Sequence, residues 1–310
     1  MLSPGDYPVT MNTAENEGQT RTMGGEFIRV DDIDMFVVRE GRGRPLVTVH
    51  GGPGLGHAYL EPTSVLAREE LEVIHYDQRG SGQSEAGDLA KVNIGGAVED
   101  LEALRAALGL DRMSLLGHSI GGHVAYLYAA RYPDRMQSLV LFATAPPLDE
   151  DVANQMWRAM AARRTPEDDA DQAAIQQSDE FKRREPTAVE RYILNAYMPF
   201  FRDRATIGRV GFDLTPTSVD SILNVGEEGF LASLPEMDPL GSLSSIQCPT
   251  VVVHAELDPT PEPFSRMLAA TILGAEFALL KRASHFAFIE DREQVARVVG
   301  DFLRRTAPSR

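Results

Sequence analysis

The sequence predicts an α/β fold, in which a mostly parallel central sheet is flanked by helices and a helical cap is inserted between two strands. Short apolar runs alternate with helix-length segments through the first half of the chain, as expected for strands joined by crossover helices. Between about 147 and 240 this alternation gives way to helix-forming residues, and it resumes near Gln247. We therefore expect a core formed by residues 25–146 and 241–310 and a helical cap formed by residues 147–240.

Each element of the core follows from a local pattern. Two short opening segments, 25–30 and 33–39, are expected to form an antiparallel edge of the sheet. Segment 95–108 carries apolar residues at helical spacing on one face and is expected to be a helix. The other expected strands lie at 45–49, 71–76, 113–116, 136–143, 249–255 and 276–280. The other expected helices of the core lie at 57–68, 122–132 and 291–304.

The composition indicates one globular unit. The chain has 310 residues, of which 43% are apolar and 25% charged, so it can bury a large core. A formal net charge of −16 argues against nucleic-acid binding and gives no attraction to anionic membranes. A substrate with a cationic end would be tolerated by such a surface. Cys248 is the single cysteine, so no internal disulfide is expected.

The N-terminal region gives an expectation about the cellular location of the protein. Residues 1–24 are polar and are expected to form a poorly ordered leader. They contain no basic segment followed by an apolar one, and the chain has no apolar stretch of 18 residues. A cytoplasmic protein without membrane association is the resulting expectation.

The run from Gly117 to Gly121 reads G-x-S-x-G and has the context of a nucleophile elbow. An expected strand precedes it and a helix-length segment follows. Ser119 would then lie on a tight turn, with glycines that let the strand and the helix pass closely. We expect Ser119 to be a nucleophile; the alternative is a serine in a glycine-rich turn without chemistry. His118 and His123 flank the elbow, but their spacing points them away from the Ser119 hydroxyl.

A nucleophilic serine needs a base, and the base needs a carboxylate that fixes its tautomer. Two late strands lead to Asp258 and His285, and groups at the carboxyl ends of parallel strands gather at one edge of a sheet. We predict that His285 is the base and Asp258 the acid. Glu256 is the competing acid. Asp258 is favoured because it lies beyond the strand, where a loop can turn it toward the imidazole.

A glycine-rich loop at 50–54 follows another expected strand. Acyl transfer develops an oxyanion, which needs preorganised N–H donors. The expected donors are the backbone N–H groups of Ile120 and Gly52, with Gly51 as the next candidate, while His50 is expected to support the turn. A dinucleotide-binding loop is the alternative, but the G-x-G-x-x-G spacing is absent. No cofactor and no metal are therefore expected.

Four motifs occur in order along the chain: H-G-G-P-G at 50–54, D-Q-R-G-S-G-Q-S at 77–84, G-x-S-x-G at 117–121 and S-H-F at 284–286. In this combination the sequence resembles the proline iminopeptidase branch of the α/β-hydrolases over about residues 25 to 305. The resemblance implies the α/β-hydrolase fold and a cofactor-independent serine hydrolase. It also implies a small-molecule or short-peptide substrate, with aminopeptidase action on N-terminal proline or another small residue as the leading expectation.

The resemblance is weaker at the residues that would select the substrate. Iminopeptidases of this branch hold the free amine with carboxylates of the cap, and Glu227 and Glu228 lie in a comparable stretch. However, His118 and Ile120 stand where those enzymes usually have glycine and an aromatic residue, and Pro259 replaces an additional glutamate of some relatives. Many esterase-like relatives share the G-H-S form, so an esterase, lactonase or amidase for a small apolar acyl compound is the alternative. A small-molecule receptor is a third possibility, against which the intact serine, aspartate and histidine argue.

The expected cap is rich in large apolar side chains, which either pack its own core or cover an apolar acyl site. They are Trp157, Tyr192, Tyr197, Met198, Phe200, Phe201 and Phe212.

Overall fold

The computed structural model describes residues 24–146 and 150–307. The leader expected at 1–24 lies outside the described residues except for Gly24, and so does the expected start of the cap at 147. None of the described helices is both long and apolar enough to cross a membrane.

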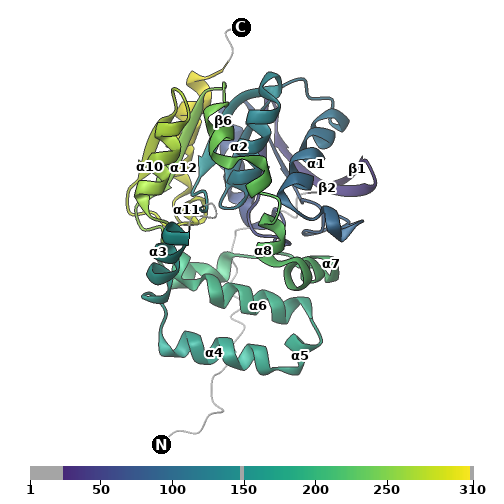
Figure 1. The fold of residues 1–310 in the computed structure, drawn as a ribbon, viewed down its shortest axis with the longest axis vertical. Helices are drawn as coiled ribbons and strands as arrows, with labels where there is room; N and C mark the ends of the chain where they lie inside the picture. The colour runs from purple at the N-terminus through teal and green to yellow at the C-terminus, as the bar shows by residue number, and fades with distance from the viewer. Residues whose placement is uncertain (1–23, 147–149, 308–310) are drawn as a thin grey trace, which may run out of the picture.

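An eight-stranded, mostly parallel sheet forms the centre of the molecule, which confirms the predicted fold class (Figure 1). Its order is β1-β2-β4-β3-β5-β6-β7-β8, and β2 pairs antiparallel with both β1 and β4 while all other pairs are parallel. The strands are β1 (Glu26–Val30), β2 (Ile33–Gly41), β3 (Arg44–Val49), β4 (Leu71–Tyr76), β5 (Met113–His118), β6 (Met136–Phe142), β7 (Thr250–Ala255) and β8 (Glu276–Leu280). β5 and β7 are buried along their whole length, because parallel strands are covered on both faces.

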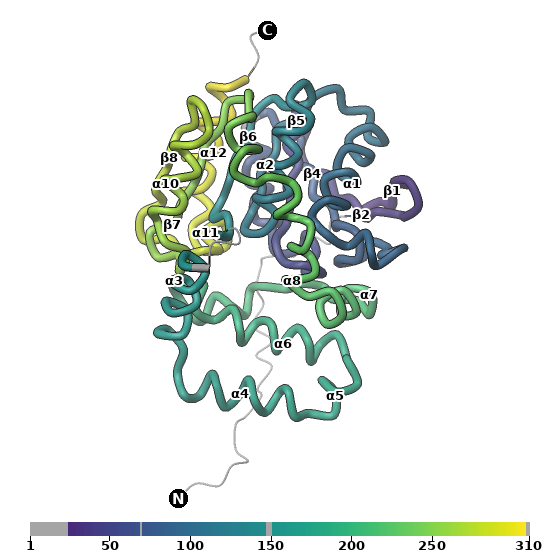
Figure 2. The backbone as a smooth tube through the Cα atoms, in the orientation of Figure 1, coloured from purple at the N-terminus to yellow at the C-terminus, as the bar shows by residue number. Residues whose placement is uncertain are grey.

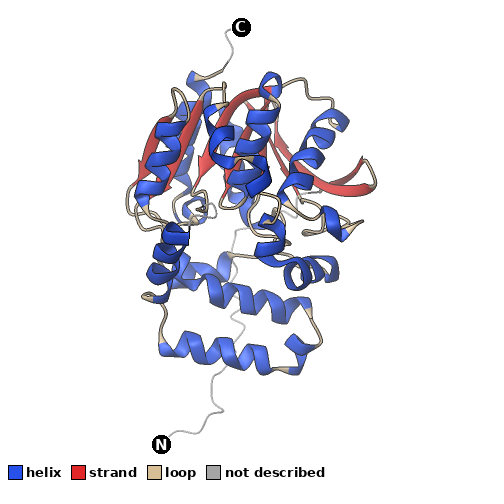
Figure 3. Ribbon diagram, viewed as in Figure 1, coloured by secondary structure: helices blue, strands red, loops and turns tan. Residues whose placement is uncertain are grey.

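Helices cover both faces of the sheet (Figures 1–3). Those of the core are η1 (Ala58–Glu69), η2 (Leu89–Lys91), α1 (Ile94–Ala107), α2 (Gly121–Arg131), η3 (Pro133–Arg135), α10 (Glu262–Thr271), α11 (Ala287–Glu290) and α12 (Arg292–Arg305). α1, α2 and α10 contribute to one hydrophobic cluster, whereas η1, α11 and α12 contribute to the other. Because successive strand residues point to opposite faces, Leu46 belongs to the second cluster and its neighbour Val47 to the first.

A run of short helices connects β6 to β7 and lies across one end of the sheet (Figure 1). We call the part from α3 to α8 the helical segment. Its elements, with α9 after it, are α3 (Glu150–Ala161), α4 (Pro166–Gln177), α5 (Asp179–Lys182), α6 (Pro186–Tyr197), η4 (Met198–Phe200), η5 (Arg204–Arg209), α7 (Pro216–Asp220), η6 (Ser221–Val225), α8 (Gly226–Leu231), η7 (Pro235–Met237) and α9 (Pro239–Ser244). The expected cap boundary at 240 falls within α9, which contacts α2 and α10 of the core.

Local signals start the helices of this segment. Pro166, Pro186 and Pro216 each occupy a first helical position, where a missing N–H removes no bond. Thr165 caps α4 by accepting a hydrogen bond from the Asp168 N–H, and the Asp168 carboxylate accepts one in return from the Thr165 N–H. These signals divide the segment into short helices that can bend around the end of the sheet.

Candidate active site

Ser119 lies on a sharp turn between β5 and α2, with a left-handed φ of 55°. This conformation is unfavourable for a residue with a side chain and is held by the packing around it. A Cβ at Gly117 would lie 2.7 Å from that of Ala125, and one at Gly121 would lie 2.2 Å from the Val49 carbonyl oxygen. Only glycine at both positions lets β5, α2 and β3 approach so closely. The turn presents the half-buried Ser119 to a cavity.

Asp258 and His285 meet at the same edge of the sheet, beyond the ends of β7 and β8. The Nδ1 atom of His285 lies 2.7 Å from Oδ2 of Asp258, and both residues are buried. The other carboxylate oxygen, Oδ1, accepts a hydrogen bond of 2.8 Å from the Thr260 N–H. Burial opposes ionisation of Asp258, but His285 and the Thr260 N–H outweigh it and lower the pKa of the carboxyl. Asp258 is therefore an ionised hydrogen-bond partner of His285.

Glu256, the competing acid, lies elsewhere. Its carboxylate pairs with the Lys281 ammonium at 3.0 Å and accepts a hydrogen bond of 2.7 Å from the Arg282 N–H. Both contacts lie at the exposed surface and lower the pKa of Glu256. The strand end thus separates the two acids, with Asp258 facing inward to His285 and Glu256 facing solvent.

The glycine loop after β3 lies beside Ser119. A Cβ on Gly51 would come within 2.9 Å of the Ser119 Cβ, and the Gly51 N–H donates a hydrogen bond of 2.6 Å to the Tyr59 hydroxyl. Gly52 has a φ of 62°, which glycine adopts freely. Gly52 and Ile120 both line the cavity that contains Ser119.

The D-Q-R-G-S-G-Q-S motif holds the glycine loop in place. Gln78 donates from its side-chain amide to the His50 carbonyl at 2.7 Å, and its backbone N–H donates to Nε2 of His50 at 3.0 Å. Ser81 accepts a hydrogen bond of 3.0 Å from the Gly54 N–H. Asp77 accepts hydrogen bonds from the backbone N–H and the ring Nδ1 of His57. These hydrogen bonds hold the glycine loop in place, and His50 supports the turn as expected.

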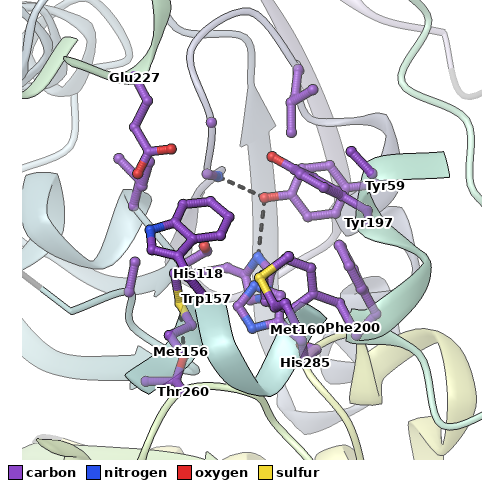
Figure 4. Close-up of a pocket in the computed structure, with 18 residues that line it drawn as sticks. Tyr59, His118, Met156, Trp157, Met160, Tyr197, Phe200, Glu227, Thr260 and His285 are labelled. Carbon is purple, nitrogen blue, oxygen red and sulfur yellow. Dashed lines mark hydrogen bonds between the residues drawn. The ribbon is translucent and has the colours of Figure 1, made fainter. Parts of the chain in front are cut away.

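A cavity of about 130 Å³ opens beside Ser119 and His285 (Figure 4). Among the described residues, Glu227 is the only acidic side chain that lines it. Trp157, which is half exposed, and Glu227 both line the cavity from the helical segment. The remaining lining is largely apolar and is formed by Leu55, Tyr59, Met156, Met160, Tyr197, Phe200 and Phe286, among others.

The structure distinguishes the two candidate glutamates of α8. Glu227 lines the cavity of Ser119, whereas Glu228 lines only the neighbouring cavity between α3 and α8. Both glutamates line that neighbouring cavity, but only Glu227 also reaches the cavity of Ser119, because adjacent helical residues point about 100° apart. Desolvation, followed by the charge of Glu228, raises the pKa of Glu227.

Some of the residues that line the cavity could be predicted from the sequence and others could not. Of the large side chains expected in the cap, Trp157, Tyr197 and Phe200 line the cavity, and the other four do not. Sequence reasoning missed Tyr59 and Thr260, which no local motif marks. Met156 and Met160 were also missed, although their spacing of four residues on α3 places them on one face of that helix.

No cluster of three or more His, Cys, Asp or Glu side chains in the described part of the chain is arranged to hold a metal ion. The functional groups that line the cavity include the Ser119 hydroxyl, the His285 imidazole and the Glu227 carboxylate.

The chain belongs to the α/β-hydrolase fold family, whose family model matches residues 44–292. It is similar to the proline iminopeptidase of Clostridium botulinum, with 28% identity over 282 residues covering 86% of this chain and 91% of that one. The proline iminopeptidase of Saccharolobus solfataricus is 25% identical over 273 residues, covering 85% and 86% of the two chains. The crystal structure of a Mycobacterium smegmatis proline iminopeptidase matches the fold with a TM-score of 0.69 at 22% identity, over 91% and 98% of the two chains.

These similarities confirm the resemblance to the proline iminopeptidase branch and the prediction of a hydrolase.

Proposed function

We propose that the protein is a serine hydrolase in which Ser119 is the nucleophile, His285 the base and Asp258 the residue that orients the base. The observation that carries this proposal is the hydrogen bond between His285 Nδ1 and Asp258 at the cavity of Ser119. An ionised carboxylate accepts hydrogen bonds only, so Nδ1 of His285 must carry the proton. In the neutral ring Nε2 is then unprotonated and available to accept the Ser119 proton.

The reaction proceeds in two stages. The Ser119 oxygen attacks the substrate carbonyl carbon, and its proton passes to Nε2 of His285, which becomes an imidazolium stabilised by Asp258. Return of that proton to the leaving group releases the amine or alcohol and leaves an acyl enzyme. Water, deprotonated by His285, then attacks the acyl carbon. The bond between that carbon and the Ser119 oxygen breaks, His285 returns the proton to Ser119, and the carboxylic acid product leaves.

The oxyanion formed at each stage is held by the backbone N–H groups of Gly52 and Ile120. Gly51, the other candidate of the glycine loop, has its N–H engaged by the Tyr59 hydroxyl, which supports Gly52 as the donor. Preorganised donors of this kind typically contribute about 10²–10³ in rate each.

The proposed substrate is a peptide or amide with a free N-terminal amine on proline or another small residue. The small apolar cavity suits a short acyl side chain, and Glu227 supplies a carboxylate for the ammonium. The helical segment acts as the cap that closes the site, since Trp157, Tyr197 and Phe200 all come from it. Sequence similarity to proline iminopeptidases supports the same substrate class.

The test compares three substrate types with the purified protein. Proline and alanine arylamides should be hydrolysed, while their N-acetylated forms, which lack the ammonium, should lose about 10–150-fold in kcat/KM. Short-chain nitrophenyl esters serve as uncharged references. Ser119→Ala should remove activity on all of them. Equal hydrolysis of the free and acetylated arylamides would contradict the aminopeptidase and leave an esterase or amidase, for which the mostly apolar lining of the cavity is suited.

A further inference from the structure

Three hydrogen bonds join residues that line the cavity into one chain, and Figure 4 draws the two that the Tyr59 hydroxyl makes. The Gly51 N–H contacts the Tyr59 hydroxyl at 2.6 Å, and that hydroxyl lies 3.1 Å from Nδ1 of His118. Nε2 of His118 lies 3.1 Å from the backbone carbonyl oxygen of His285. Neither ring nitrogen of His118 is directed to Ser119, so the imidazole next to the nucleophile has a task other than proton transfer to it.

The direction of every bond in this chain is fixed by chemistry. The His285 carbonyl can only accept, so Nε2 of His118 carries the proton. A neutral imidazole has one ring proton, which leaves Nδ1 as an acceptor for the Tyr59 O–H. The Gly51 N–H then donates to the Tyr59 oxygen. Burial lowers the pKa of His118 well below its ordinary value, so His118 is neutral as this pattern requires.

These bonds have little exposure to solvent. The His118 side chain is fully buried and Tyr59 is 3% exposed. The rings of Phe142, Phe286 and Phe288 surround the His118 imidazole, with centroid distances of 4.9 to 6.0 Å. In such surroundings a hydrogen bond is strong, and an unpaired polar group is costly. The hydrogen bonds from Gly51 through Tyr59 and His118 to His285 therefore form a rigid link, which we call the bridge.

The link joins two parts of the site that come from strands separated in the sheet. The glycine loop follows β3 and His285 follows β8, and β5, β6 and β7 lie between these strands in the sheet. His118 is the last residue of β5 and directly precedes Ser119, so the bridge passes next to the nucleophile. We propose that Tyr59 and His118 are positioning residues that fix the proposed oxyanion donors relative to His285, an inference that rests on the serine hydrolase proposed above.

The fixed direction of the bridge has a further consequence for the reaction. The rings of His118 and His285 have centroids 4.6 Å apart. When His285 takes the Ser119 proton it becomes positive, and a second positive imidazole at that distance would oppose the step. Because the Tyr59 hydroxyl occupies Nδ1 as a donor, His118 stays neutral while His285 is charged.

The chain itself offers a matched control. His123 is also buried, with Nδ1 3.0 Å from the Tyr126 hydroxyl and Nε2 3.0 Å from the Ala145 carbonyl oxygen, and burial lowers its pKa to about 4. This second tyrosine–histidine–carbonyl chain has the same chemistry and burial but joins neither the glycine loop nor His285. The test therefore compares Tyr59→Phe and His118→Phe with Tyr126→Phe and His123→Phe.

The main readout is the rate constant for labelling of Ser119 by a fluorophosphonate, which depends on the nucleophile, base and oxyanion donors but on no assumed substrate. At a temperature where each variant is folded, Tyr59→Phe and His118→Phe should label about 10–100-fold more slowly, because small misplacements of reacting groups cost rates of this size. Tyr126→Phe and His123→Phe should lower thermal stability while labelling near the wild-type rate. His118→Gln, whose amide can donate and accept, should recover part of the lost rate that His118→Phe does not.

A second readout is the far-downfield proton NMR resonance of the His285 Nδ1 proton, which should shift or broaden only in the Tyr59 and His118 variants. Folded Tyr59→Phe that labels at the wild-type rate would overturn the bridge, as would an equal loss in Tyr126→Phe. Both results would leave the serine hydrolase intact. A wild-type protein that is not labelled at Ser119 would instead contradict the hydrolase itself, and the bridge with it.

Discussion

Asp258 and Glu256 leave the end of the same strand two residues apart, and their surroundings give them different chemistry. Asp258 is buried against His285 at 2.7 Å, whereas Glu256 is engaged at the surface by Lys281 and the Arg282 N–H. An orienting carboxylate must touch the imidazole, because its effect depends on fixing the tautomer. At the scale of the residue, this contact separates the two acids in the direction that the sequence favoured.

The consequence is a ranking of two isosteric variants. Asp258→Asn keeps the shape but offers an amide, which favours the wrong tautomer of His285, and kcat should fall by about 10⁴-fold. Glu256→Gln removes a surface charge remote from the reaction and should leave kcat near the wild-type value. Steady-state kinetics on a common substrate measures both. The opposite ranking would assign the orienting role to Glu256.

At the scale of the element, the short helix α8 places an acidic side chain in the lining of the cavity. Glu227 and Glu228 are adjacent in its first turn, but only Glu227 lines the cavity of Ser119. Because its pKa is raised, Glu227 loses its charge at a higher pH than an ordinary glutamate as the solution is acidified.

Glu227→Gln should therefore raise KM for amino-acyl arylamides and lower kcat/KM by about 10–150-fold, since a hydrogen bond to a charged group contributes about 1.5–3 kcal/mol. Hydrolysis of an uncharged nitrophenyl ester should hardly change. Glu228→Gln is the matched control, with the same charge removed one residue away, and should affect the arylamides little. Equal losses in the two variants would indicate a general effect of charge rather than a specific amine site.

Buried histidines contribute to how the stability of the whole molecule responds to acid. Burial lowers the pKa of His50 and His123 to about 4 and that of His75 to about 3, and it also lowers the pKa of His118. In the unfolded chain each returns to about 6.5, so the unfolded state binds more protons as the pH falls. His57 acts in the opposite direction. Although desolvation lowers its pKa, the hydrogen bond and charge of Asp77 outweigh this and raise it, so its stabilising effect is present at low pH.

The free energy of unfolding should consequently decrease between pH 7 and pH 5, by about 2 kcal/mol for each histidine that stays neutral in the fold, less the contribution of His57. Urea denaturation at several pH values measures this slope. His123→Gln should flatten it by about the same 2 kcal/mol, independently of its own effect on stability at pH 7. A slope unchanged in this variant would contradict the neutral state of His123.

The architecture and the positions of the candidate reactive groups could be predicted because both have local signals. Short apolar runs mark the buried strands, and the spacing of Gly117, Ser119 and Gly121 marks the turn between β5 and α2. Asp258 and His285 follow strand ends, which meet at one edge of any parallel sheet. Their catalytic roles remain predictions to be tested by the variants above.

By itself, the sequence determined the class of fold, the family and the branch it resembles, because these depend on short patterns that each segment carries alone. The tertiary structure alone decided that Tyr59 reaches Gly51 and His118, that Glu227 and not Glu228 lines the cavity, and that Met156 and Met160 join the lining. Each of these depends on how η1 and the helical segment pack against the end of the sheet. Such packing brings together residues that lie tens to hundreds of positions apart, and no local spacing encodes which side chains then face one another.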